Sequence, residues 1–380
     1  MNKIIKIILF LVLTFLQSVS ANEKIKIGLL VPLTGKNLEI GMSIINSTRL
    51  AINKIDNSSI EIIPRDTGSD PNITLRSAKE LSELGVKIII GPVFNNNLEY
   101  LDELKEITFL SLTNKSTNNS KNIINAGINA TSQIKAIKKF IKLNKIKKTI
   151  FLTPDANYKN EIEKAIASSK IKIINNYTYN TDPTKLTKQI EKITNYKKRK
   201  KNLEDEITRL EKSDENNKER LIEKLKKSDT IGDVKFDSLI IADFDEGLKS
   251  VTTSLLYTDV SPKEKYFITL NQWFDKSLLI ESSSQPLYFP SINKKNYEAF
   301  SLEYFNRYNH YPNQLSFLSF DLVGLVYFLI IQNNSIIDNE IFTRKNLFKG
   351  KVGIFEIKNN KINHILNFYK IEDKKFKKIF

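Results

Sequence analysis

Two short apolar runs, each ending at glycine or proline, constrain the fold of this chain most strongly. The first lies in Lys24–Gly35 (KIKIGLLVPLTG) and the second in Gly85–Asn97 (GVKIIIGPVFNNN). Such runs are typical of strands that are buried on both faces, as in a parallel sheet covered by helices. Loops that follow these strands lie at the carboxyl edge of the sheet, where open α/β folds bind ligands. We therefore expect both loops to contribute to a binding site.

Strand and helix patterns alternate around these two runs, and this order predicts a parallel sheet with right-handed crossovers. The predicted helices are Leu38–Ile55, Ile73–Leu84 and one around Leu98–Glu106, and the predicted strands are Ser58–Pro64, Val86–Ile90 and Thr108–Leu112. The same alternation returns after residue 131 and indicates a second α/β lobe. We place the first lobe at residues 22–130, completed by about 290–350, and the second at residues 131–289, completed by about 351–380.

Residues 184–228 interrupt the second lobe. They are dense in Lys and Glu, and their apolar residues are spaced mostly by three or four. Ser213–Asn217 favours a turn, so we expect a helical hairpin or short coiled coil. The basic cluster Lys197–Lys201 is interpreted either as a solvated helix face or as a docking surface.

The C-terminal part of the chain carries three further patterns. Asn296–Tyr308 and Leu318–Ile331 predict helices. Gly350–Lys358 and Lys361–Lys370 predict a β-hairpin that turns at Asn359-Asn360. We interpret Phe376–Phe380 as a basic tail.

The N-terminal residues 1–21 predict the compartment. A basic start is followed by an apolar run that is too short to span a membrane and by the small-residue pattern Val19-x-Ala21. We expect a signal peptide that is cleaved before Asn22 and an exported, periplasmic protein that does not span the membrane after cleavage. Because the chain has no Cys, we do not expect a lipoprotein.

Composition excludes several functions. The formal net charge is +16, but the basic residues are dispersed and no aromatic residues are interleaved with them, so nucleic-acid binding is not expected. Interaction with an anionic surface stays open. With no Cys and two His, neither a disulfide nor a zinc site is expected, and we predict no metal and no cofactor. The nucleophile-elbow, metalloprotease and P-loop motifs are absent, so we do not expect an enzyme.

Several segments together resemble a known family. VPLTG, RDTGSDPNITLRSAKELSELGVKIIIGP and ITFLSLTN are similar to the type 1 periplasmic binding proteins of the leucine/isoleucine/valine group. FDSLIIADFDEGLKSVTTSLLYTDV, FITLNQWFD and FKGKVGIFEI are closest to the branch labelled penicillin-binding-protein activators or ABC-type substrate-binding proteins. The resemblance implies two doubly wound α/β lobes with a ligand in the cleft between them, here with an inserted helical hairpin.

The resemblance also implies a set of ligand-binding residues. In amino-acid-binding members, hydroxyl and backbone N–H groups of two loops bind the ligand carboxylate, and the second lobe contributes a Tyr and an acid. Matching positions here are Asn95, Asn96, Ser111, Thr113, Asn114, Tyr158, Asp243 and Trp273. For each of these residues, ordinary loop structure or helix capping is the alternative. Gln272-Trp273 lacks the acid expected for the α-ammonium, and Ile40 replaces a covering aromatic ring.

Two functions follow from the resemblance. The first is a solute-binding protein that captures a small polar, amino-acid-like ligand for an ABC permease. The second is a non-enzymatic regulator of a peptidoglycan synthase that acts by protein–protein contact, which the missing acid, the basic charge and the inserted hairpin favour.

Overall fold

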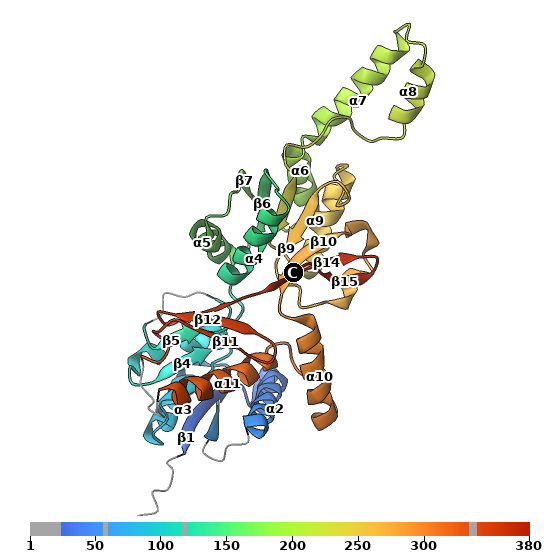
Figure 1. Cartoon of the computed structure of the whole chain (residues 1–380). Coiled ribbons are helices and arrows are strands. Elements are labelled where there is room, and N and C mark those ends of the chain that lie inside the picture. Colours follow the sequence, from blue (N-terminus) through green and yellow to red (C-terminus); the bar gives the residue numbers. More distant parts are fainter. Residues whose placement is uncertain (1–23, 56–59, 116–119, 334–339) are drawn as a thin grey trace, which may run out of the picture. The chain divides into compact units, whose positions relative to one another are not determined.

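The structure is a computed structural model that describes residues 24–55, 60–115, 120–333 and 340–380 (Figure 1). The predicted signal peptide lies outside these residues. The chain divides into two compact units. The first is Met1–Leu112, Asn119–Ile124 and Leu315–Ile341, and the second is Thr113–Asn118, Asn125–Gln314 and Phe342–Phe380.

A five-stranded sheet in the order β2-β1-β3-β4-β5 forms the centre of the first unit. Its strands are β1 (Ile25–Val31), β2 (Ile60–Asp66), β3 (Ile88–Ile90), β4 (Thr108–Ser111) and β5 (Ile123–Asn125). β1 pairs in parallel with both β2 and β3, and β3 pairs in parallel with β4. All residues of β1 except Lys26 are buried, which confirms the prediction of a strand covered on both faces.

Helices α2 (Leu38–Ile55), α3 (Pro71–Glu83) and α11 (Ser316–Gln332) cover this sheet. α2 and α11 pack together, and buried hydroxyls join them: Ser43 Oγ lies 2.6 Å from Ser316 Oγ. The Asp70 carboxylate caps α3 by accepting from the backbone N–H groups of Asn72 and Ile73.

The helix predicted around Leu98–Glu106 is wrong. Two 3₁₀ turns occupy this region, η2 (Asn95–Leu98) and η3 (Leu101–Glu103). The Asn122 amide donates to the carbonyl oxygens of Leu101 and Leu104, so these groups are satisfied without a continued helix. Asn97 donates to the Thr74 hydroxyl and thereby fixes the other end of the region to α3.

The second unit contains a seven-stranded sheet in the order β15-β14-β10-β9-β8-β6-β7. Its strands are β6 (Thr149–Pro154), β7 (Asn175–Tyr179), β8 (Ser238–Ile241), β9 (Tyr266–Thr269), β10 (Leu287–Ser291), β14 (Asn367–Glu372) and β15 (Lys375–Lys378). The strands β7, β6, β8, β9 and β10, which are neighbours in that order, pair in parallel. β14 pairs antiparallel with β10, and β15 pairs antiparallel with β14.

The prediction that Phe376–Phe380 forms a basic tail is therefore wrong. The tail starts within an edge strand, and Phe376 packs against the core of the second unit. Lys377 pairs with Glu372, and the Phe380 ring stacks on Phe368 at 5.5 Å. The partial burial of the Phe376 and Phe380 rings holds the segment on the sheet.

Helices α4 (Ala130–Leu143), α5 (Lys159–Ser169), α6 (Pro183–Ile193), α9 (Asp245–Tyr257) and α10 (Lys294–Tyr308) also belong to the second unit. Leu186 and Ile190 of α6 are buried in its core and pack on α9. α10 falls within the range predicted to complete the first lobe. It lies with the second unit because Glu303 pairs with Lys351 and the backbone N–H of Lys294 donates to the Tyr369 hydroxyl.

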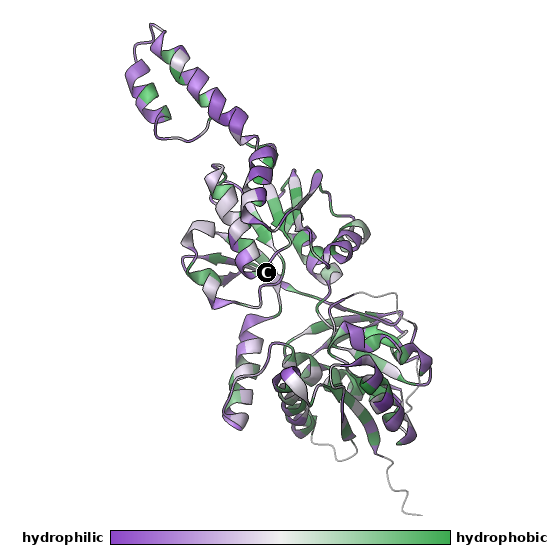
Figure 2. Ribbon diagram, turned by 180° about the vertical axis from the view of Figure 1, so that it is seen from behind, coloured by the Kyte–Doolittle hydropathy of each residue, from purple (hydrophilic) through white to green (hydrophobic). Residues whose placement is uncertain are grey.

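α7 (Tyr196–Glu211) and α8 (Lys218–Leu225) follow α6 and lie side by side (Figure 1). Both helices are hydrophilic along most of their length, whereas the central strands of the two large sheets are mostly hydrophobic (Figure 2). Leu203 and Leu210 are the buried apolar residues of α7.

A third sheet contains β11 (Asn346–Lys349), β12 (Ile354–Lys358) and β13 (Lys361–His364). β12 and β13 form the hairpin that was predicted at Asn359-Asn360. Both asparagines have positive φ, at 51° and 56°, as a two-residue type I′ turn requires. The predicted second arm ends at His364, because β14 starts at Asn367 in another sheet.

Candidate functional site

The loop after β1 is held by the Asp66 carboxylate at the end of β2. Asp66 accepts from the backbone N–H of Leu33 at 2.7 Å and from the Thr34 hydroxyl at 2.6 Å. Burial opposes ionisation, but hydrogen bonds from Thr34, Gly68 and Leu33 outweigh it and lower the pKa of Asp66. The strand-end loop of the first unit is thus fixed in place by a charged anchor.

The loop after β3 contains two of the predicted residues, Asn95 and Asn96. Asn96 is exposed, and Asn95 is half-buried. The Oδ1 atoms of Asn95 and Asn97 are buried and have no hydrogen-bond donor among the described residues. Buried acceptors are costly unless a donor satisfies them. This loop therefore holds two buried acceptors that lack a donor among the described residues.

The predicted residues at the end of β4 and in the loop after it differ in their surroundings. Ser111 is fully buried, and its hydroxyl donates to the Pro92 carbonyl oxygen at 3.0 Å. Thr113 is buried and accepts from the Lys115 N–H, whereas Asn114 is exposed. Ser111 belongs to the first compact unit, whereas Thr113 and Asn114 belong to the second.

In the second unit, the structure brings Tyr158 and Asp243 together. Asp243 lies two residues after the end of β8 and is 9% exposed. Its carboxylate accepts from the Tyr179 hydroxyl at 2.5 Å and from the Phe244 N–H at 2.9 Å. The Tyr158 hydroxyl donates to the Ala242 carbonyl oxygen at 3.2 Å. Burial, followed by the Asp243 carboxylate, raises the pKa of both tyrosines, so both phenols stay neutral donors.

Gly247 makes room for this carboxylate in the first turn of α9. A Cβ atom at position 247 would lie 2.5 Å from both carboxylate oxygens of Asp243. The Asp243 carboxylate therefore lies at the N-terminal end of α9, where a negative charge is stabilised.

Trp273 lies in the loop after β9, and its neighbour Gln272 contacts Asp243 at the end of the second-unit sheet. Gln272 is buried and donates to the Asp243 carbonyl oxygen at 3.1 Å and to the Thr269 hydroxyl at 3.0 Å. Trp273 itself is partly exposed, with φ at 49°. Asp275, the nearest acid in sequence, caps the following 3₁₀ turn through the Ser277 N–H.

Asp66 and Tyr179 were not predicted at these edges, and Asn97 and Gln272 lay in predicted loops without being assigned to the site. Tyr179 is the last residue of β7, and a polar aromatic residue at a strand end is the signal that marks it. The contact between Tyr179 and Asp243 spans 64 positions, which no local pattern reveals. No group of three or more acidic, His or Cys residues suited to a metal occurs within the described part of the chain.

Comparison with known proteins agrees with this architecture. Residues 24–197 match the periplasmic binding protein family. A search of curated proteins gives no match. None of the described helices is long and apolar enough to cross a membrane.

Solved structures share the fold across nearly the whole chain. A putative branched-chain amino acid ABC transporter protein from Rhodospirillum rubrum is 12% identical, with a TM-score of 0.71 over 94% of this chain and 100% of that one. The C-domain of LpoA from Haemophilus influenzae, a regulator of PBP1A, is 15% identical, with a TM-score of 0.63 over 93% and 100%. A leucine-binding protein from Thermotoga maritima is 14% identical, with a TM-score of 0.57 over 94% and 98%.

The fold and the strand-end edges define the class: the chain has the architecture of a type 1 periplasmic binding protein, with two α/β lobes built on largely parallel sheets. Within that class, its structural neighbours include both branched-chain amino acid binders and LpoA, so the predicted resemblance is confirmed.

Proposed function

We propose that the chain is a periplasmic solute-binding protein that captures a small polar, amino-acid-like ligand and delivers it to an ABC permease. The buried Oδ1 atoms of Asn95 and Asn97 carry this proposal, because they need donors that the described residues do not supply. An ammonium or amide group of a ligand would satisfy them. The family match and the predicted signal peptide support the compartment and the binding role.

Binding is tested by calorimetry on protein that has been unfolded and refolded to remove any bound ligand. We expect at least one compound from a panel of amino acids and small carboxylates to bind with Kd on the order of 1 μM. Asn95→Ala should weaken that binding by roughly tenfold, since a hydrogen bond to a charged donor is lost. Asn202→Ala, at an exposed position of α7, is the matched control and should bind normally. A panel without any ligand contradicts the proposal.

A second function is favoured by the second-unit edge. Tyr158, Tyr179, Asp243 and Gln272 already bond to one another or to the backbone, and Gln272-Trp273 supplies no acid for an α-ammonium. A regulator of a peptidoglycan synthase needs no such acid. The likeness to the LpoA C-domain supports this alternative. In it, α7 and α8 form a hairpin inserted into the second lobe for contact with the partner.

The alternative is tested by pull-down from a cell-envelope extract. The bait is the whole chain or a variant in which a short Gly/Ser linker replaces residues 202–223. α6 is kept in this variant because it belongs to the core. Capture of a peptidoglycan synthase that is lost with the variant supports regulation. Equal capture by both baits removes the hairpin from the interface, and no captured synthase contradicts the alternative.

A further inference from the structure

Charge is segregated along α7 and α8. Seven exposed lysines gather where α7 begins and where α8 ends: Lys197, Lys198, Lys200, Lys201, Lys224, Lys226 and Lys227, here named the lysine collar. None of the seven forms an ion pair within the described part of the chain. Elsewhere on the two helices, from Glu204 to Glu223, acidic and basic residues are mixed, and Asp229 follows the collar. The collar is thus a concentrated patch of unpaired positive charge.

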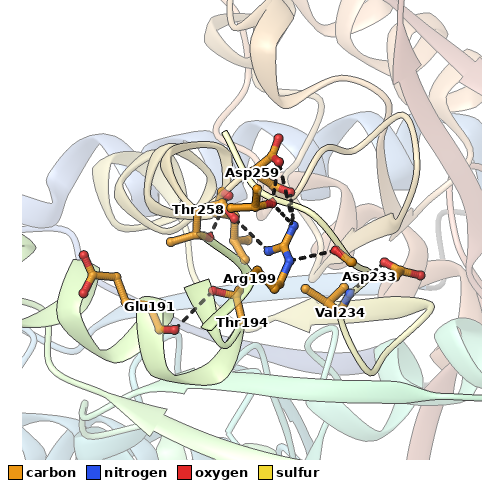
Figure 3. A network of polar contacts seen from close by, with 10 residues as sticks. Glu191, Thr194, Arg199, Asp233, Val234, Thr258 and Asp259 are labelled. Atoms are coloured by element: carbon orange, nitrogen blue, oxygen red, sulfur yellow. Dashed lines mark hydrogen bonds and ion pairs between the residues drawn. The ribbon is translucent and has the colours of Figure 1, made fainter. Parts of the chain in front are cut away.

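Arg199 lies among these lysines but faces the opposite way. It is 7% exposed, and its guanidinium donates to the carbonyl oxygens of Gly232, Thr258 and Asp259 at 2.9–3.0 Å (Figure 3). It also donates to the Thr230 hydroxyl at 2.7 Å. At about 100° per residue, the neighbouring lysines fan over the helix face opposite to Arg199. The start of α7 is therefore clamped to the second unit with its lysines directed outward.

The helix dipole favours the lysines at the end of α8, but helix stability does not account for those at the start of α7. The positive end of the helix dipole lies at the start of α7, where cations are disfavoured. The first turn of α7 contains no acid, and five consecutive basic residues follow Tyr196. A local cost without a structural gain indicates a function.

We propose that the lysine collar is a peripheral contact for a membrane surface that carries anionic phospholipid headgroups. Specific protein interfaces are usually built around aromatic or Arg anchors, whereas Arg199 is engaged with the second unit and Tyr196 packs on Tyr257. Lysine ammonium groups act as point charges, which suit a fluid layer of phosphates better than one fixed fork geometry. Each lysine close to an anionic bilayer strengthens binding roughly fivefold. This inference does not depend on what the strand-end site binds.

The test is sedimentation of the purified chain with vesicles of about 30% phosphatidylglycerol in phosphatidylcholine at about 0.1 M salt. The collar variant is K197Q/K198Q/K200Q/K201Q, in which Gln keeps the helix propensity. The matched control is K79Q/K87Q/K142Q/K172Q, which removes four exposed lysines from other elements. We expect the collar variant to lose at least roughly tenfold in partitioning, while the control loses far less. Vesicles of pure phosphatidylcholine should bind none of the three proteins.

Any of three results with vesicles would overturn the proposal. The wild-type chain fails to bind anionic vesicles, the collar variant binds them as well as wild type, or the control loses as much as the collar variant. Circular dichroism of each variant confirms that the helices are intact. Capture of an acidic protein by the collar without vesicle binding would assign the patch to protein recognition and also overturn the proposal.

Discussion

His364, the last residue of β13, is buried with an exposed fraction of 4%. Its Nε2 atom donates to the Ala126 carbonyl oxygen at 2.8 Å, and Phe355 lies edge-on at 4.7 Å. Its Nδ1 atom has no partner among the described residues. Burial lowers the pKa of His364 from 6.5 to about 4, because a second proton would leave a charge in an apolar environment.

This histidine should make stability depend on pH. The folded-state pKa lies below the unfolded value, so its stabilising contribution is complete above pH 6.5 and is lost as pH falls toward 4. Between pH 7.5 and 5 we expect a loss of about 2 kcal/mol from this residue. Urea unfolding at both pH values should show that His364→Gln lacks this part of the loss, whereas His310→Gln, at an exposed histidine, keeps it. Equal pH dependence in all three proteins would contradict the assignment.

Asp243 and Gly247 should be energetically coupled. A helical Gly→Ala change usually stabilises by up to about 1 kcal/mol, but here the new methyl group meets the Asp243 carboxylate. We expect Gly247→Ala to destabilise by about 1–3 kcal/mol. On an Asp243→Ala background the obstruction is gone, and the same change should become neutral or stabilising. A double-mutant cycle from urea unfolding measures the coupling, and strictly additive effects would rule out the contact.

At the scale of residues, the sequence predicted which side chains lie at the strand ends better than it predicted their hydrogen-bond partners. Tyr158 and Asp243 were expected from the resemblance, and they lie at one edge. Ser111 was expected for its hydroxyl, but its bond to Pro92 depends on how two loops pack, which no local pattern encodes. Asp66 was not predicted, yet it fixes the loop after β1.

At the scale of elements, α7 depends on Arg199. Arg199→Met keeps much of the volume but leaves several backbone carbonyl groups without their donor, so we expect a loss of about 2–4 kcal/mol. Hydrogen exchange of the α7 amides should accelerate with it. Arg209→Met is the control, since Arg209 is exposed and its ion pairs among the described residues are with Glu206 and Glu215, and it should change stability little. Protected α7 amides in the Arg199 variant would show that the clamp is dispensable.

The elements that were predicted wrongly share a physical cause. Around Leu98–Glu106 the Asn122 amide takes carbonyl groups that a helix would have used. At Lys375–Lys378, pairing with β14 and the stacking of Phe380 turn a basic tail into a strand. In both cases partners outside the segment override the local pattern. Where the apolar face alone decides, as in α2, the predicted bounds Leu38–Ile55 match those of the structure.

At the scale of the whole molecule, the order of strands and helices was enough to predict two α/β lobes. That order survives at identities of 12–15% to proteins of the same fold. The antiparallel addition of β14 and β15 was not predicted, because β10 and β14 are far apart in the sequence and their pairing depends on the folded path of the chain between them. Ligand identity is likewise set by a few loop side chains rather than by the fold.

The net charge of the molecule yields the last prediction. A formal charge of +16 repels itself in the compact state, and salt screens this repulsion. We expect the thermal midpoint to rise between about 0.01 M and 0.15 M sodium chloride. The collar variant and its matched control each lower the formal charge from +16 to +12, that is 16 − 4, so both should show a smaller rise. A midpoint that falls with salt would contradict the argument. A reduced rise in the collar variant alone would place the repulsion at the start of α7 rather than across the molecule.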